Sequence, residues 1–129
     1  AAVFSPNAPA IVDPDLAFGG VVIPMLYVSG TEDVVAAFGQ TVAHRRIAFE
    51  HSRNTTRYLL MANGANHAAW SGTRRREPAA NPRARESVKA VGLAFWQAYL
   101  MGDRAALGWL RNDAAEVVDG EFEVREPDK

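Results

Sequence analysis

The sequence contains no cysteine among its 129 residues, and this absence excludes disulfide bonds, thiolate metal sites and a cysteine nucleophile within the chain. A long hydrophobic run is also missing, because the longest one, at 21–28, is far shorter than the ~20 residues that a membrane-spanning helix needs. Neither sign of charge is in excess: 14 basic and 15 acidic residues give a net charge of -1. The charge therefore gives no indication of a nucleic-acid or anionic membrane partner.

The composition that remains is typical of one soluble globular domain, with 48% hydrophobic and 22% charged residues. Residues 1–4 are apolar and follow no basic or signal-like segment, so we expect a strand there that belongs to a longer fold. No pair of histidines has the spacing of a metal site, and we expect neither a metal nor an organic cofactor. The compartment, cytoplasmic or exported, is not indicated.

Apolar runs and turn residues divide the chain into alternating strands and helices. Continuously apolar segments bounded by polar turns predict strands at 1–4, 21–28 and 57–62. Apolar residues at helical spacing predict helices at 86–101 and 104–111, with Gly102 as the stop between them and Asp103 as an N-cap. Less regular spacing indicates a partly helical stretch at 34–51, and residues 117–118 and 122–124 suggest a small ribbon. This order predicts an α/β fold with parallel strands and flanking helices.

Polar side chains follow two of the predicted strands at the points where they end. Asp33 comes after the strand at 21–28, and His67 comes after the strand at 57–62. In parallel α/β sheets, functional groups gather just beyond these carboxyl ends. A carboxylate beside an imidazole can orient the histidine and stabilise the imidazolium that forms when it takes a proton from a nucleophile.

A simpler interpretation is that Asp33 caps the following segment and that His67 is an exposed histidine without a chemical role. Glu32 competes with Asp33 as the acid because it is the neighbouring residue. The remaining histidines, His44 and His51, lie between predicted strands, and both are expected to be surface residues.

The segment from Phe18 to Gly72 resembles the C-terminal region of α/β-hydrolases of the dienelactone hydrolase and platelet-activating-factor acetylhydrolase-like group. The resemblance lies in three motifs that occur in order: Ile23-Pro24-Met25-Leu26 with Gly30-Thr31-Glu32-Asp33, Tyr58-Leu59-Leu60 with Gly64-Ala65-Asn66-His67, and Phe95-Trp96-Gln97-Ala98-Tyr99-Leu100 with Gly102-Asp103 and Trp109-Leu110. Each motif is weak alone, and their order and spacing together are more specific.

The resemblance implies that residues 1–111 are the C-terminal portion of an α/β-hydrolase domain and that 112–129 form an acidic C-terminal extension. It implies a serine-type hydrolase of carboxylic esters or lactones, with Asp33 as catalytic acid and His67 as catalytic histidine. These enzymes carry nucleophile, acid and histidine in that chain order, so the nucleophile is expected before Ala1. We therefore expect the chain alone to be inactive.

The sequence departs from the family because it has no G-x-S-x-G nucleophile elbow. None of its serines has the small flanking residues and following helix of an elbow: Ser5, Ser29, Ser52, Ser71 and Ser87. Two alternatives stay open. The chain is a non-catalytic hydrolase-like fragment or binding module that needs a complementary N-terminal portion, or an upstream Asp or Cys nucleophile gives a dehalogenase or a dienelactone-type hydrolase.

Two further features bear on ligands and partners. Trp70 is a candidate substrate-binding residue that would line the pocket, although it could equally pack against the helix at 86–101. The basic stretch at 74–85 lacks interleaved aromatic residues and is expected to be solvated. A sheet of three parallel strands would leave a long apolar edge, so we expect pairing with an N-terminal portion of the same hydrolase, or self-association along that edge.

Overall fold

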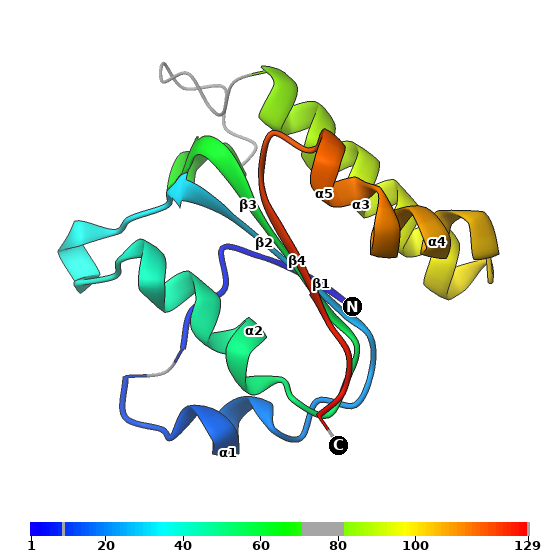
Figure 1. The fold of residues 1–129 in the computed structure, drawn as a ribbon. Helices are drawn as coiled ribbons and strands as arrows, with labels where there is room; N and C mark the ends of the chain where they lie inside the picture. The colour runs from blue at the N-terminus through cyan, green and yellow to red at the C-terminus, as the bar shows by residue number, and fades with distance from the viewer. Residues whose placement is uncertain (9, 71–81, 129) are drawn as a thin grey trace.

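The computed structural model describes residues 1–8, 10–70 and 82–128, which form a mixed four-stranded sheet with helices on both faces (Figure 1). The strands lie side by side in sequence order: β1 (Ala2–Phe4), β2 (Met25–Glu32), β3 (Arg57–Asn66) and β4 (Gly120–Arg125). The first three run parallel, and β4 runs antiparallel to β3. The predicted α/β class is therefore confirmed, and the strands expected at 1–4, 21–28 and 57–62 run parallel; the expectation of a sheet with parallel strands alone is corrected by β4, which makes the sheet mixed.

The two central strands form where the sequence is continuously apolar. Residues 25–30 of β2 and 57–62 of β3 are all buried, as expected for parallel strands covered on both faces. The strand predicted at 21–28 begins only at Met25, directly after Pro24, which has no N–H to donate to a ladder. β3 continues four residues past its predicted end, to Asn66.

Helices cover both faces of the sheet (Figure 1). One face carries α1 (Pro14–Phe18) and α2 (Ile47–His51), with the 3-10 turns η1 (Ala36–Phe38) and η2 (Val42–Arg46) leading into α2. The other face carries α3 (Pro82–Leu100), α4 (Arg104–Asn112) and α5 (Ala114–Val117), and the 3-10 turn η3 (His67–Trp70) follows β3. The irregular spacing at 34–51 thus reflects three short helical pieces rather than one helix, and α1 was not predicted.

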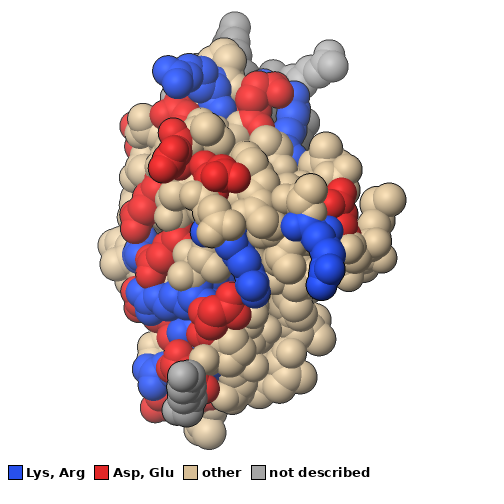
Figure 2. All heavy atoms as spheres, turned by 45° about the vertical axis from the view of Figure 1, so that its right-hand side comes forward, with Lys and Arg blue, Asp and Glu red and all other residues tan. Residues whose placement is uncertain are grey.

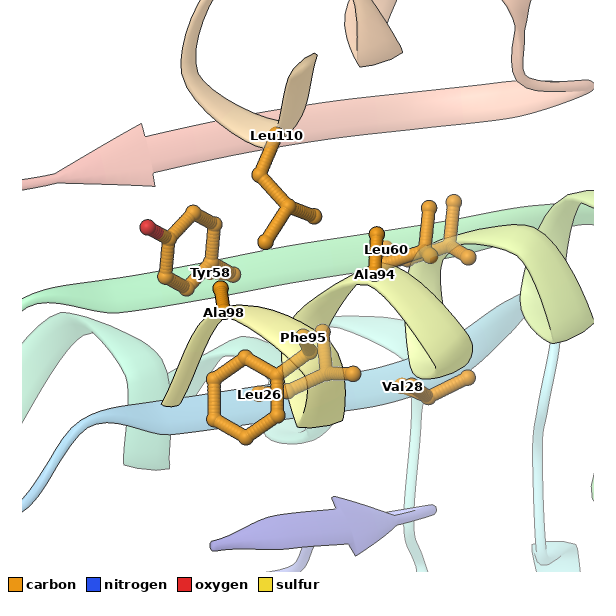
Figure 3. Packing of buried hydrophobic residues seen from close by; sticks show 9 residues of the cluster. Leu26, Val28, Tyr58, Leu60, Ala94, Phe95, Ala98 and Leu110 are labelled. Carbon is orange, nitrogen blue, oxygen red and sulfur yellow. The ribbon is translucent and has the colours of Figure 1, made fainter. Parts of the chain in front are cut away.

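Alternate residues of the central strands belong to two separate cores. Leu26 and Val28 of β2 and Tyr58 and Leu60 of β3 face α3 and belong to one core cluster with Phe95 (Figure 3). The intervening residues face α2, where Phe49 is fully buried. This division follows from the two-residue period of a strand. Burying each large apolar side chain contributes about 1.5–3 kcal/mol.

The junction between α3 and α4 agrees with the sequence prediction. Gly102 has a φ of 70°, a left-handed conformation that glycine adopts without strain. The Asp103 carboxylate accepts hydrogen bonds from the backbone N–H groups of Ala105 and Ala106 at 2.8 and 3.1 Å, so it caps α4 as predicted.

β4 closes the β3 side of the sheet with residues that were expected to form an acidic extension. Its side chains Phe122 and Val124 pack against the α3 core. On the opposite face, Glu121 and Glu123 form ion pairs with Arg46 at 2.9 and 2.8 Å. Residues 114–125 therefore belong to the same folded unit, and the predicted ribbon at 117–118 is instead α5 and the turn before β4.

The uncovered side of the sheet is the short strand β1. The outer face of α3 carries three exposed apolar side chains, Leu93, Trp96 and Leu100. Figure 2 brings the side of α3 and α4 forward and shows many charged side chains along one margin and a broad area with few of them. Within the described residues, no helix has the length and apolar character needed to cross a membrane.

Candidate active site

The sheet topology places Asp33 and His67 at the same edge. Asp33 directly follows β2 and His67 directly follows β3, and these strands are neighbours that run in the same direction. The two carboxyl ends therefore meet, as the positions of the residues in the sequence predict. The structure brings the side chains together, with Asp33 Oδ1 and His67 Nδ1 separated by 3.1 Å.

The ends of β2 and β3 approach closely because a glycine faces the neighbouring backbone. A β-carbon on Gly30 would lie 1.9 Å from the carbonyl oxygen of Ala65, so the two backbones can lie this close only when residue 30 has no side chain. The register shifts between Gly30 and Glu32, and the Gly64 N–H donates to Thr31 Oγ1 at 2.9 Å across the irregularity. This bulge directs the chain from the strand into the Asp33 turn.

The Asp33 carboxylate is completely buried and is surrounded by donors. Ser29 Oγ and Trp70 Nε1 donate to Oδ2 at 2.7 and 3.2 Å. On the other oxygen, Arg45 Nη2 lies 3.3 Å from Oδ1, beside the contact with His67. A buried charge is tolerated when it is paired and hydrogen-bonded, as this one is.

Two opposing influences act on the pKa of Asp33. Burial raises this pKa, because desolvation penalises the charged form. The hydrogen bonds from Ser29 and Ser5, the Arg45 cation and the hydrogen bond to His67 all lower it, and together they outweigh burial. The pKa of Asp33 therefore lies below its ordinary value, and the group is a carboxylate at neutral pH.

The His67 ring is exposed while its partner is buried, with side-chain exposed fractions of 55% and 0%. A carboxylate can only accept a hydrogen bond, so the proton of the neutral ring sits on Nδ1. Nε2 is then the basic nitrogen of the ring. Both contacts of the ring with other described side chains are made through Nδ1, so the basic nitrogen is available to a group outside these residues.

Ser5, which follows β1, also contacts the histidine. Its Oγ lies 3.0 Å from His67 Nδ1, and it has a φ of 50°, the one non-glycine residue with positive φ in the described ranges 1–8, 10–70 and 82–128. This is the nitrogen that Asp33 already occupies, and a protonated Nδ1 has no lone pair to accept a proton from the hydroxyl. Ser5 also hydrogen-bonds Asp33. The geometry thus makes Ser5 a partner of the acid rather than a nucleophile.

Trp70 lies at the side of the pair and has two kinds of contact. Its indole N–H donates to Asp33, and its ring lies 5.8 Å from that of Phe4 between centroids. It also packs against the α3 side of the core, near Ala84 and Val88. The two rings form an aromatic wall at this side of the site. Solvent reaches this wall, because Phe4 is 49% exposed.

The other candidates from the sequence lie elsewhere. Glu32 is exposed, whereas Asp33 beside it points into the site. His44 Nδ1 accepts a hydrogen bond from the Thr41 backbone at 3.1 Å, and His51 pairs with Asp15 at 2.6 Å. Of the basic stretch, Arg83 and Arg85 belong to α3, while Arg74, Arg75 and Arg76 lie outside the described residues.

Three residues of the site were not predicted from the sequence as part of it. Ser29 was judged only as a nucleophile, although a serine inside an otherwise apolar buried strand is a signal that it bonds a neighbour. Ser5 follows a strand end, as Asp33 does, and could have been grouped with it. Arg45 gave no signal, because nothing in an irregular polar stretch distinguishes one arginine from the next.

In the part of the chain that the structure describes, no group of three or more His, Cys, Asp or Glu side chains is arranged so that it could hold a metal ion. Comparison of the chain with protein-family models, with curated proteins and with solved structures finds no match.

Proposed function

We propose that this chain is the C-terminal part of a serine-type α/β-hydrolase of the dienelactone hydrolase and platelet-activating-factor acetylhydrolase-like group, acting on carboxylic esters or lactones. The observation that carries the proposal is the 3.1 Å contact between Asp33 Oδ1 and His67 Nδ1 at the ends of neighbouring parallel strands. The motif resemblance and the chain order of acid before histidine support it.

In this proposal His67 Nε2 takes the proton of a serine as its oxygen attacks the ester carbonyl, and then gives the proton to the departing alcohol. A water molecule releases the acyl group by the same proton transfers in a second step. Asp33 holds the Nδ1–H tautomer and stabilises the imidazolium. The serine and the oxyanion-hole amides come from a portion of the hydrolase before β1.

Trp70 serves this site in two ways. Its hydrogen bond to Asp33 helps to fix the acid, and its ring with Phe4 would line the side of a pocket for the acyl or leaving group. An aromatic wall next to the basic nitrogen favours neutral, partly apolar substrates, in keeping with esters or lactones.

The partner in this proposal adds to the sheet at β1. Alternate residues of a strand face the same neighbour, and Ala1 and Ser5 bond β2 through their backbones at 2.9 and 2.7 Å. The backbone groups of Ala2 and Phe4 therefore point to the open side. A strand of the N-terminal portion, or of a second copy, would satisfy them.

A second candidate is a non-catalytic hydrolase-like fragment or binding module. It is favoured by the position of Ser5, since the one described serine that contacts the histidine does so through the wrong nitrogen. An upstream Asp or Cys nucleophile is a third candidate, because the Asp33–His67 pair serves those reactions as well.

The test replaces His67 by Ala in the complete protein and measures ester hydrolysis. We expect turnover to fall by at least about 10³-fold with the fold intact, because the proton carrier is gone. His51→Ala is the matched control, since His51 also pairs with an aspartate but lies away from the site, and we expect near-normal turnover. Near-normal activity in His67→Ala would show that His67 is not the catalytic histidine. Labelling of the complete protein by a fluorophosphonate tests separately whether the nucleophile is a serine.

A further inference from the structure

Arg45 is a buried cation that no step of the proposed reaction uses. Its side chain is 1% exposed. Nε donates to the backbone carbonyl of Asp33 at 3.2 Å, and Nη2 lies 3.3 Å from Asp33 Oδ1 and 2.9 Å from Gln40 Oε1. Nη1 donates to the Pro6 carbonyl at 3.3 Å. The guanidinium therefore bonds both the main chain and the side chain of the acid.

These contacts join the two loops that meet at the histidine. Pro6 follows Ser5 in the loop after β1, and Asp33 begins the loop after β2. Among the described residues, the side chains of Ser5 and Asp33 contact His67 Nδ1. One rigid guanidinium thus fixes the position of one loop relative to the other at the point where both reach the ring.

The two oxygens of Asp33 are held differently. Oδ2 accepts hydrogen bonds from Ser29 and Trp70, which are both neutral. Oδ1 faces the imidazole and has Arg45 on its other side. Without the guanidinium, Oδ2 would stay in place and Oδ1 would be free to turn away from the ring.

We propose that Arg45 is a positioning residue, which directs Asp33 Oδ1 to His67 Nδ1 and thereby selects the Nδ1–H tautomer of the ring. Its effect on hydrolysis rests on the proposed function, whereas its effect on the tautomer does not. The action depends on the planar fork and not on charge alone, because the ammonium of a lysine is a compact point donor that cannot span the same acceptors.

The rival explanation is that Arg45 only neutralises a buried carboxylate. Lysine would then serve as well, since it carries the same charge. The two explanations therefore differ in what they predict for Arg45→Lys. The neighbouring Arg46 provides a matched control, because its ion pairs with Glu121 and Glu123 are remote from the acid.

The experiment records long-range ¹H–¹⁵N correlation spectra of the chain, which report the ring nitrogen that carries the proton of neutral His67. We expect Nδ1–H in the unmodified chain and in Arg46→Lys, and a shift toward the Nε2–H tautomer in Arg45→Lys and in the reference variant Asp33→Asn. A folded Arg45→Lys chain that keeps the Nδ1–H tautomer overturns the proposal.

If Arg45→Lys does not fold, Gln40→Leu provides a second test of the proposal by the same spectrum. This variant removes only the outer acceptor of Arg45, and we expect a smaller tautomer shift in the same direction; an unchanged spectrum overturns the proposal. In the complete protein, Arg45→Lys should lower kcat by at least about tenfold with little change in KM. Absence of esterase activity would end the proposed function and leave the tautomer result standing.

Discussion

Gly30 and Ala65 lie so close that their contact leaves no room for a side chain: a β-carbon on Gly30 would be 1.9 Å from the Ala65 carbonyl oxygen. Both atoms that would collide are tied to the backbone, so Gly30→Ala must push β2 and β3 apart where the Asp33 and His67 loops begin. We expect the free energy of unfolding to fall by about 1–3 kcal/mol, as for other overpacked interiors. Denaturant titration measures it.

Gly92→Ala is the control for this prediction, because no atom within 4 Å would meet the new methyl group inside α3. We expect this variant to gain about 0.5–1 kcal/mol from its helix propensity. Equal stabilities of the two variants would mean that the close approach of the strands is not a constraint.

The depressed pKa of Asp33 predicts how stability depends on pH. A carboxyl group whose folded pKa lies below its unfolded value contributes stability that is fully present above the unfolded value, and this contribution is lost as pH falls through the folded pKa. Asp33→Asn lacks the contribution and leaves Arg45 buried without its anion. At neutral pH we expect the variant to be less stable by about 3–5 kcal/mol.

The measurement is denaturant unfolding of both proteins from neutral to acid pH. The difference between them should be constant above the ordinary aspartate value of 3.8 and should shrink below it. A difference that stays constant into strong acid would show that the carboxylate is not preferentially stabilised in the folded state.

Ser5→Ala separates a positioning role from a nucleophilic one. Its Oγ contacts the ring nitrogen that Asp33 holds, so the variant loses one hydrogen bond. We expect the free energy of unfolding to fall by about 0.5–1.5 kcal/mol, and turnover of the complete protein to fall by no more than about tenfold. Fluorophosphonate labelling should persist. If labelling disappears in Ser5→Ala but not in Ser29→Ala, then Ser5 is the nucleophile and the chain carries its own triad.

The open side of β1 makes a prediction about association. We expect the isolated chain to sediment with a mass that rises above 14.0 kDa as concentration increases, unless an N-terminal portion covers the edge. Ala2→Pro removes an N–H that points to the open side and spares the bonds of Ala1 and Ser5 to β2. This variant should remain monomeric with an unchanged circular dichroism spectrum. A monodisperse monomer for the unmodified chain would contradict the association prediction.

Local patterns in the sequence predicted the central strands, the α3–α4 junction and the convergence of Asp33 and His67, because strand period, capping and parallel topology act over short distances or through one simple rule. They placed a short strand at 122–124, inside β4, but did not predict that β4 pairs with β3, because this pairing joins residues far apart in the chain. Arg45 was missed for the same reason. Arg45 donates hydrogen bonds to carbonyl groups in the loops after β1 and β2, and these loops come close together only after the sheet has formed.

The antiparallel strand β4 also determines how large an assembly of this chain could become. This edge strand carries Glu121, Glu123 and Arg125 on its α2 face, and charged side chains on an edge strand disfavour pairing with an incoming strand, whereas β1 has no charged side chain. Two copies meeting through their β1 strands would form a closed pair related by a two-fold axis, and each would then present only its charged margin to the outside. Fibres form only when every subunit can pair through both edges of its sheet. Assembly of this chain would therefore stop at the dimer.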